Sequence, residues 1–384
     1  MALALVRLIG QPTPERTDAV RQAARSVDVE GMLDLLAPQR LVPTLGGPLL
    51  EAAQPELPAH VVERIQAARL RARTRGLLHH DLTRRLTVAL SERGIPVAPL
   101  KGAELAEAVY GDIGARQSSD IDLLVPLAEL DRAVEVAESH GWREPELLRA
   151  AGRPRLHREL FHATLPPLEL HWRVHWYEDS FAGAALARAR ASDEGWLRLQ
   201  PADEVAFLLL FLARDGFAGL RQTVDVAAWW AALGEGETTP ARVRAVANAH
   251  PRLKRALMAA ASHVENLAAL PPGSLARRPG GLSRRQHAAL RLANPWLSGS
   301  REQIRADVSL VDGLLGPRHG ARGFIGRQVL PPRWVLLRRQ PKLQRASRAR
   351  VGAARVGHAA RVLGRYALAS RALITGPRSS RRVP

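Results

Sequence analysis

The sequence predicts an α+β fold in which a small mixed β-sheet is flanked by N-terminal and C-terminal helical regions. Apolar residues recur at helical spacing in the first quarter of the chain, and short strand-like runs alternate with helix-forming runs in the next. From Pro201 on, apolar residues again recur at helical spacing, without strand-like runs. The predicted organisation is an N-terminal helical region (1–94), a core (95–200), a second helical region (201–312) and a basic C-terminal arm (313–384). A chain of 384 residues can bury a substantial core in two or three such units.

The composition excludes several kinds of site. Cysteine is absent, so the chain has no disulfide, no Cys-ligated zinc and no thiol nucleophile. The N-terminus MALALVRLIG lacks the basic and long apolar regions of a secretory signal. No apolar run reaches the roughly 18 to 20 residues that a membrane span needs. We therefore expect a cytoplasmic protein.

The positive charge is concentrated in the arm. Residues 313–384 hold 17 of the 56 Lys and Arg residues and no Asp or Glu, which leaves 39 basic and 37 acidic residues before them. An anionic partner, RNA or a lipid surface, is therefore expected for the arm alone. The arm has three interpretations: a solvated and partly disordered segment, a nucleic-acid patch, or an amphipathic helix. The helical interpretation rests on an apolar stripe formed by Val351, Ala354, His358, Val362 and Tyr366.

The N-terminal region is predicted to be helical and to form an arm or cap before the core. Thr13-Pro14-Glu15 is typical of a helix start, and Val29 to Leu36 has helical spacing. A long amphipathic segment follows from Pro55 to Arg93. Gly94-Ile95-Pro96 ends it.

The core begins with an arrangement that suits phosphate. Val97 to Leu100 has the length and composition of a strand, Lys101-Gly102 forms a turn, and Ala103 to Tyr110 is strongly helix-forming. Free backbone N–H groups and the helix dipole favour an anion at such a helix N-terminus. Many α/β proteins turn in the same way, so this arrangement is weak evidence by itself.

The rest of the core alternates strands and helices. Gly111 to Ser119 is predicted as a loop, Asp120 to Val125 as a strand, and Leu127 to His140 as an amphipathic helix. Leu156 to Leu165 and Leu168 to Trp176 are predicted as two strands of a hairpin in the same sheet.

Paired carboxylates indicate a metal site. In a strand, side chains at i and i+2 point to one face, so Asp120 and Asp122 would lie side by side. Glu169 and His171 share a face in the same way. The alternative is that the two aspartates are a turn cap and a solvated strand residue. The apolar residues that surround them favour the metal site.

The second helical region begins with an apolar helix from Asp203-Glu204 and breaks at Gly216 to Gly219. Leu220 to Leu233 forms a further helix, and a linker rich in Pro, Gly and Arg follows at Pro271 to Leu282. Asp225 lies on the apolar second helix. It is either the buried partner of an arginine or a contact to an acceptor, and we favour the arginine partner.

The segment LKGAELAEAVYGDIGARQSSDIDLLV resembles the signature of the DNA polymerase beta-like nucleotidyltransferase superfamily, most closely an uncharacterised nucleotidyltransferase family within it. LELHW, from Leu168 to Trp172, resembles the strand that carries the third carboxylate. The resemblance covers residues 77 to about 230 and implies a nucleotidyltransferase palm. It implies that Asp120, Asp122 and Glu169 are catalytic and hold two Mg²⁺ ions, with a nucleoside triphosphate such as ATP as substrate. Carboxylate oxygens suit magnesium.

The resemblance also leads us to predict nucleotide-binding residues. The spacing from Gly102 to Asp120 is longer than usual in the superfamily, and Ala103 replaces the usual Ser or Gly. Lys101, Gly102, Arg116 and Ser118 are predicted to bind the nucleotide, although Lys101 and Arg116 could be surface cations. His171 is interpreted as a supporting or packing residue rather than a ligand.

Two functions remain open from the sequence. The first is magnesium-dependent transfer of a nucleoside monophosphate to an unidentified acceptor, which could be a small molecule, a peptide or a nucleic acid. The second is a non-catalytic binding protein that uses the basic arm to hold nucleic acid or another partner. The complete set of carboxylates favours the enzyme.

Overall fold

A computed structural model gives the fold of the chain. It describes residues 1–149, 156–178, 180–193, 195–237, 240–276, 281–317, 329–331, 333, 336, 337, 340, 342, 343 and 346–374.

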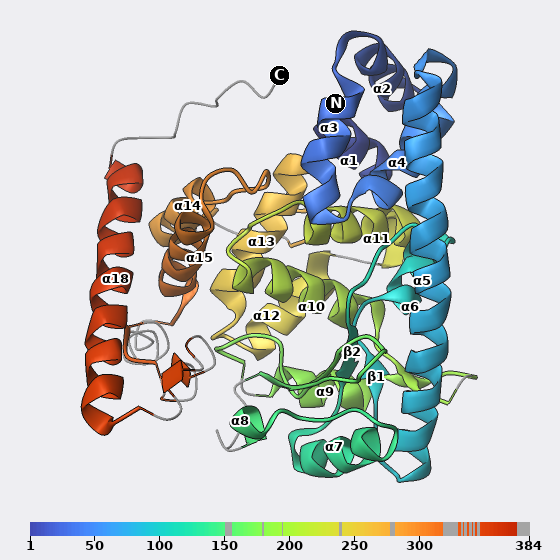
Figure 1. Cartoon of the computed structure of the whole chain (residues 1–384). Coiled ribbons are helices and arrows are strands. Elements are labelled where there is room, and N and C mark those ends of the chain that lie inside the picture. The colour runs from blue at the N-terminus through green and yellow to red at the C-terminus, as the bar shows by residue number, and fades with distance from the viewer. Residues whose placement is uncertain are drawn as a thin grey trace.

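The helices occupy both ends of the chain, and the short strands lie between them (Figure 1). The helices before the core are α1 (Ala2–Gly10), α2 (Pro14–Ser26), α3 (Val29–Leu36), η1 (Ala37–Gln39), α4 (Val42–Ala53), η2 (Gln54–Glu56) and α5 (Ala59–Glu92). The core contains β1 (Ala98–Pro99), α6 (Ala103–Tyr110), β2 (Ile121–Leu124), η3 (Leu127–Glu129), α7 (Leu130–Ser139), α8 (Glu146–Arg149), β3 (His157–Leu160), β4 (Leu168–His171), α9 (Phe181–Arg188), β5 (Arg190–Ala191) and β6 (Leu197–Arg198). The helices that follow are α10 (Pro201–Arg214), α11 (Arg221–Glu237), α12 (Pro240–Ala249), α13 (Lys254–Leu267), α14 (Arg284–Arg291), α15 (Arg301–Leu315) and α18 (Arg348–Ile374).

The main sheet has four strands in the order β1-β2-β4-β3. β2 is antiparallel to β1 and parallel to β4, and β3 and β4 form the antiparallel pair that the hairpin prediction requires. β5 and β6 form a separate antiparallel pair. The predicted α+β class with a small mixed sheet is therefore confirmed.

Alternation along the strands separates an apolar face from a polar one. Ile121 and Leu123 of β2 lie in one buried cluster with Leu168 and Leu170 of β4 and with apolar residues of α5 and α7. Period-2 geometry turns the intervening residues toward the opposite face. This face carries Asp122.

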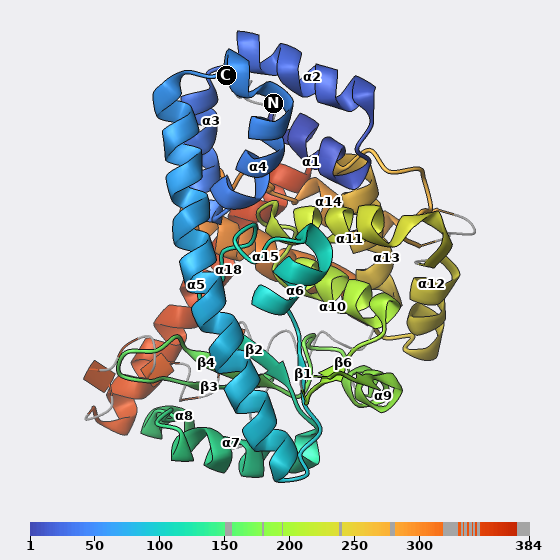
Figure 2. The same cartoon turned by 90° about the vertical axis from the view of Figure 1, so that its right-hand side faces the viewer.

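The helices at the two ends of the chain share one hydrophobic core. α1 packs on α11, and α4 packs on α5. The same buried cluster contains Leu5 and Leu45 from the N-terminal helices and Phe207 and Leu257 from later ones. Figure 2 shows α5 running from the N-terminal helices down to the sheet. Helices far apart in the sequence therefore bury one another's apolar faces above the sheet.

The described part of the basic arm contains a helix that packs on the body. α18 lies against α15 at the edge of the molecule (Figure 1). Val351, His358 and Val362 are buried, as the predicted apolar stripe requires. The amphipathic-helix interpretation is therefore confirmed for 348–374, and residues 318–328 and 375–384 lie outside the described part. Among the described residues, no helix combines the length and the apolar character needed to cross a bilayer.

Candidate active site

Asp122 lies at the centre of the polar face of the sheet. Only 3% of the residue is exposed. Its Oδ1 lies 3.2 Å from Lys101 Nζ and 2.9 Å from His171 Nε2. Leu100 donates its backbone N–H to the Asp122 carbonyl at 3.1 Å, and this bond holds the Lys101 turn beside the strand. A buried carboxylate that lies beside a lysine and accepts a hydrogen bond from an imidazole is suited to stay ionised.

Glu169 is brought to Asp122 by the register of two parallel strands. The two residues are directly paired between β2 and β4. His171 Nε2 lies 3.1 Å from Glu169 Oε2, so one imidazole nitrogen lies between both carboxylates. The sum of its two contacts, 2.9 Å and 3.1 Å, limits the separation of the two oxygens to about 6 Å. His171 therefore supports the carboxylates, which agrees with the role interpreted from the sequence.

The surroundings lower the pKa values of Asp122 and Glu169 and raise the pKa of His171. Burial by itself would raise the pKa of Asp122, but Lys101 and His171 hold this pKa well below its ordinary value. Burial likewise opposes ionisation of Glu169, yet its hydrogen bond with His171 lowers its pKa. Burial would lower the pKa of His171, and its hydrogen bonds to both carboxylates raise it instead. The carboxylates are therefore ionised at neutral pH, and His171 retains the proton that it donates.

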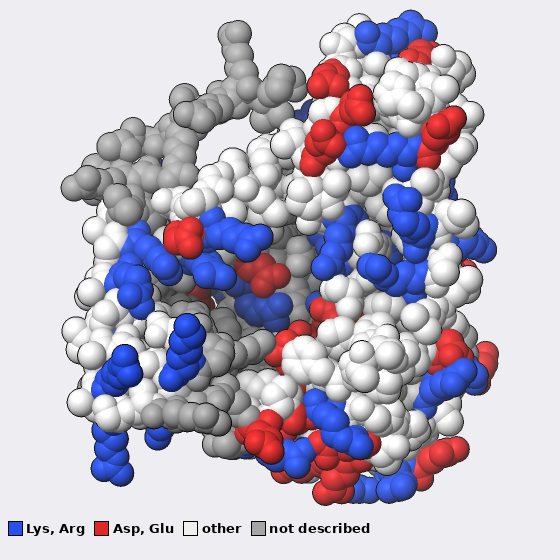
Figure 3. Space-filling view, viewed as in Figure 1, with Lys and Arg blue, Asp and Glu red and all other residues white. Residues whose placement is uncertain are grey.

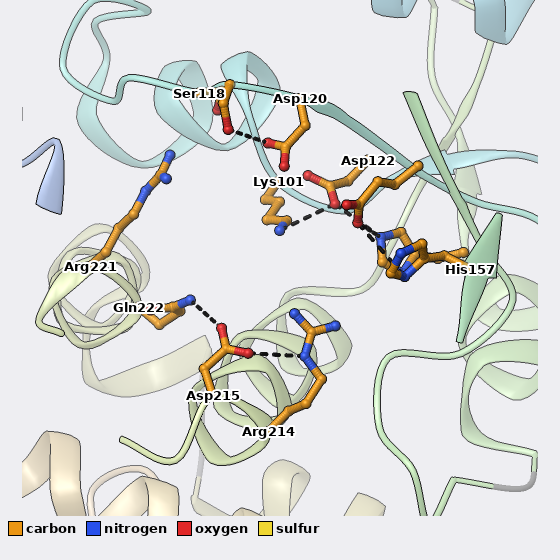
Figure 4. Close-up of polar contacts among 12 residues, drawn as sticks. Lys101, Ser118, Asp120, Asp122, His157, Arg214, Asp215, Arg221 and Gln222 are labelled. Atoms are coloured by element: carbon orange, nitrogen blue, oxygen red, sulfur yellow. Dashed lines mark hydrogen bonds and ion pairs between the residues drawn. The ribbon is translucent and has the colours of Figure 1, made fainter. Parts of the chain in front are cut away.

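Asp120 lies one residue before the strand. The prediction of a strand from Asp120 to Val125 was wrong at its ends, because β2 spans only Ile121–Leu124. Asp120 accepts a hydrogen bond from Ser119 Oγ at 3.2 Å. Figure 4 shows the Asp120 and Asp122 side chains directed toward the same open space. The bend before β2 therefore leaves both carboxylates facing this space.

The Lys101-Gly102 turn brings a cation and a helix N-terminus to this space. Gly102 is the N-cap of α6, and no side chain caps the helix there. Lys101 Nζ lies 4.4 Å from the centre of the Phe211 ring of α10 as well as beside Asp122. The first turn of α6 therefore offers backbone N–H groups to an anion, and Lys101 adds a positive charge.

Replacing Gly102 with alanine is expected to lower the free energy of unfolding by about 1–3 kcal/mol. Gly102 has φ +95° and ψ −139°, a region that side-chain-bearing residues rarely adopt. The added Cβ would meet only Ser118 Oγ, at 3.8 Å, so backbone strain is the source of the cost. Urea unfolding measures it. Gly183→Ala in α9 is the control, because its Cβ meets nothing within 4 Å and a helical Gly→Ala change is expected to gain about 0.5–1 kcal/mol. A Gly102→Ala protein as stable as the parent would contradict the strained turn.

Arg116 and Ser118 lie in the loop before the aspartates. Arg116 is 4% exposed and donates from Nε to both Asp225 oxygens, at 3.1 and 3.0 Å. Its Nη1 donates to Ser118 Oγ at 2.9 Å. Tyr110 donates to Asp225 Oδ1 at 3.0 Å. Asp225 is therefore the buried partner of an arginine, as the sequence suggested. The contacts of Arg116 hold the loop, and its predicted nucleotide-binding role stays a prediction.

Further cations face the carboxylates from α10 and α11. Figure 4 places Arg214, Asp215, Arg221 and Gln222 across the open space from the carboxylates. Arg214 donates to Asp215 at 3.1 Å, and Gln222 donates to the same carboxylate at 3.2 Å. On the face seen in Figure 3, the surface is hollowed near its centre, with acidic and basic side chains on the walls. The open space is therefore lined by positive as well as negative groups.

The sequence reasoning missed Arg214 and Arg221. They lie on either side of the Gly216–Gly219 break, Arg214 at the end of α10 and Arg221 at the start of α11. The available indication in the sequence was an arginine at the end of one apolar helix and another at the start of the next. Burial and the neighbouring Arg116 lower the pKa of Arg221 to about 10, a sign of crowded positive charge.

His157 of β3 adds a possible nitrogen ligand beside Glu169 and His171. His157, Glu169 and His171 offer ligand atoms that all lie within 4.8 Å of one another. Burial and the adjacent His171 lower the pKa of His157 to about 3, so its ring is neutral. Its Nδ1 is buried and has no hydrogen bond within the described part of the chain. Nitrogen ligands suit transition metals better than magnesium, whereas the aspartates and Glu169 offer oxygen.

A family model described as an uncharacterised nucleotidyltransferase matches residues 25–268. The chain belongs to this family. The match confirms the resemblance drawn from the sequence, and it spans both the carboxylate strands and the α10–α11 segment. No curated protein and no solved structure matches the chain. Membership in the uncharacterised nucleotidyltransferase family supports nucleotidyl transfer as the general chemistry and a nucleotide as a substrate.

Proposed function

We propose that this nucleotidyltransferase moves a nucleoside monophosphate from a nucleoside triphosphate to an acceptor, with a divalent metal held by Asp120, Asp122 and Glu169. The convergence of Asp122 and Glu169 on His171, beside the Lys101-Gly102 turn, carries the proposal. Carboxylates gathered next to an uncapped helix N-terminus provide one place for metal and phosphate together.

The donor set fits magnesium. The carboxylate oxygens are the ligands that magnesium prefers, and the lowered pKa of Asp122 and of Glu169 keeps them charged. Lys101 already places a positive charge 3.2 Å from Asp122 Oδ1, which shows that this oxygen can face a cation. When bound, two magnesium ions would stabilise the charge on the attacking and leaving oxygens of an in-line displacement. We assign the metal role to the carboxylates, because His171 Nε2 is occupied by its bonds to them.

In the proposed reaction the acceptor nucleophile forms a bond to the α-phosphorus. The bond from that phosphorus to the oxygen bridging to the β-phosphate breaks, and pyrophosphate leaves with the electron pair. The proton of the nucleophile leaves to water at the open side of the site. No covalent intermediate on the protein is needed, so the protein acts by positioning and by electrostatic stabilisation.

The residues of the chain have distinct roles in this scheme. Lys101 and the N–H groups of the first α6 turn bind phosphate oxygens, and Gly102 allows the backbone to approach them. Arg214 and Arg221 bind the phosphates from the opposite wall, since a guanidinium fork matches phosphate oxygens. His171 orients Asp122 and Glu169 through a single nitrogen. Ser118 and Arg116 keep the loop in place.

Transfer of label from each of the four nucleoside triphosphates tests the proposal. The protein is incubated with Mg²⁺ and a cell extract containing acceptors. Label at the α-phosphate is expected to become attached to an acceptor, whereas label at the γ-phosphate is released in pyrophosphate, and EDTA stops both. The absence of transfer with every nucleotide and with Mg²⁺, Mn²⁺ or Zn²⁺ would overturn the proposal. Salt-sensitive RNA binding in its place would favour the non-catalytic binding protein.

A further inference from the structure

A second positively charged pocket lies beside the active site. It is a cavity of about 290 Å³ between α5, the start of α4 and the loop before β2. Its charged lining consists of Arg40, Arg64, Arg71 and Arg75, and Gln117 lies at its edge. A volume at the lower end of the range for ligand pockets suits a small anionic group better than a whole nucleotide.

The charge of this arginine pocket is largely unneutralised. Arg64 pairs with Asp34 at 2.6 Å. Arg40, Arg71 and Arg75 form no ion pair with a carboxylate in the described ranges of the chain. The pocket therefore has an excess of roughly three positive charges on one concave surface. A phosphate group, which carries nearly two negative charges at neutral pH, fits this excess better than a single carboxylate.

The backbone around the pocket also favours an anion. α4 begins at Val42, next to the pocket, and no side chain caps its N-terminus. The partial positive charge of a 12-residue helix is therefore directed to the same place as the arginines. Arg40 has φ +59° and ψ 32°, a left-handed conformation that residues with a side chain rarely adopt. Such strain persists where the surrounding structure requires it, often at ligand sites.

Gln117 connects this pocket to the catalytic carboxylates. Its carbonyl accepts a hydrogen bond from Arg221, which faces the active site. Gln117 precedes Asp120 by three residues, so their Cα atoms are at most about 11 Å apart. Arg40 is also close enough to Arg221 to help lower the pKa of Arg221. A ligand held by the arginines could therefore reach the carboxylates with another of its groups.

We infer that the arginine pocket binds a phosphate group of the acceptor, and that the acceptor of this enzyme is a phosphorylated molecule. The claim that the phosphorylated molecule is the acceptor rests on the proposed function, whereas phosphate binding in the pocket does not. The nucleotide phosphates are assigned to Lys101, the first turn of α6, Arg214 and Arg221, none of which lines the pocket. The pocket then anchors the second substrate while its nucleophile faces the α-phosphate.

Phosphate binding without metal tests the inference. Inorganic phosphate is titrated in EDTA and followed by ³¹P NMR for the full chain and for an Arg71→Ala/Arg75→Ala variant. Both side chains are exposed, and alanine keeps α5 helical, so folding is preserved. Arg84→Ala/Arg85→Ala is the matched control, because these arginines are exposed on the same helix and lie outside the pocket. We expect a loss of affinity of about tenfold or more for the first variant and less than about twofold for the control.

Further measurements identify the kind of molecule that carries the phosphate. They also separate this inference from the proposed function. A ten-nucleotide RNA that displaces phosphate, and that loses affinity in the same variant, identifies a nucleic-acid acceptor. An RNA that fails to displace phosphate identifies a small phosphorylated acceptor. The titration contains neither metal nor nucleotide, so a failure of the catalytic assignment leaves its result unchanged and is seen separately in the transfer assay. Equal losses in the two arginine variants, or no phosphate binding by the parent, would overturn the inference.

Discussion

The Asp122→Asn variant is expected to lose metal-dependent nucleotide transfer by about 10³-fold or more. Asp122 Oδ1 faces Lys101 and His171, and its carboxylate is proposed to hold the metal. Asparagine keeps the shape of the side chain but removes the negative charge. A loss of several kcal/mol of metal and transition-state stabilisation corresponds to a change of this size.

The measurement is the initial rate of α-phosphate transfer at saturating Mg²⁺, with circular dichroism to show that the variant is folded. Asp131→Asn is the matched control, because the same change is made at a side chain that is 82% exposed and lies outside the candidate site. Its rate should stay within about twofold of the parent. Glu169→Gln, at a less buried position, provides a second test of the carboxylate set. Turnover at the parent rate in Asp122→Asn would rule out its role.

The Asp225→Asn variant is expected to lose about 3–5 kcal/mol of unfolding free energy. Arg116 and Asp225 are 4% and 2% exposed in their side chains and lie 3.0 Å apart. Removing the carboxylate charge leaves a buried guanidinium with no counterion, and the desolvation cost of that charge is then uncompensated. Tyr110 also donates to this carboxylate, so a second buried bond weakens with it. The loop that carries Ser118 would lose its anchor.

Urea unfolding of parent and variant measures this loss. Asp131→Asn again serves as the control, since Asp131 is solvent-exposed and Arg158 keeps its ion pair with Glu144, so the change is expected to cost less than about 1 kcal/mol. If the two aspartate variants were equally stable, the Arg116–Asp225 pair would not be a structural anchor, and Arg116 would be free for the nucleotide-binding role predicted from the sequence.

Much of the local structure could be predicted because it depends on neighbouring residues. The helix from Ala103 to Tyr110 has the predicted ends, since Gly102 precedes it and Gly111 follows it in the left-handed region. Strand ends were less predictable. The strand from Leu168 to Trp176 was predicted too long, since pairing with the neighbouring strands ends at His171. Strand length depends on the partner strand, which local sequence does not specify.

The sequence pointed to the carboxylates, to Lys101 and to His171, whereas it did not link the groups from α10, α11 and β3 to the site. Period-2 alternation identified Asp122 and Glu169 as residues on one face of their strands. Their pairing in adjacent parallel strands became visible only with the register between β2 and β4. Arg214, Arg221 and His157 carry no local pattern that links them to the aspartates. They reach the site through the packing of α10, α11 and β3.

By itself the sequence determined the α+β class, the positions of most helices, the concentration of basic residues in the arm and the family to which the chain belongs. The class and the helices follow from periodicity and turn residues, and the charge of the arm follows from composition. The family was reached through the resemblance of the segments that carry Asp120, Asp122 and Glu169. Only the tertiary structure decided that Arg116 pairs with Asp225, 109 residues away, and that His171 lies between Asp122 and Glu169. Burial accounts for the difference, because a charged group that folding removes from water must find a partner of opposite charge, and packing decides which residue is near enough to provide it.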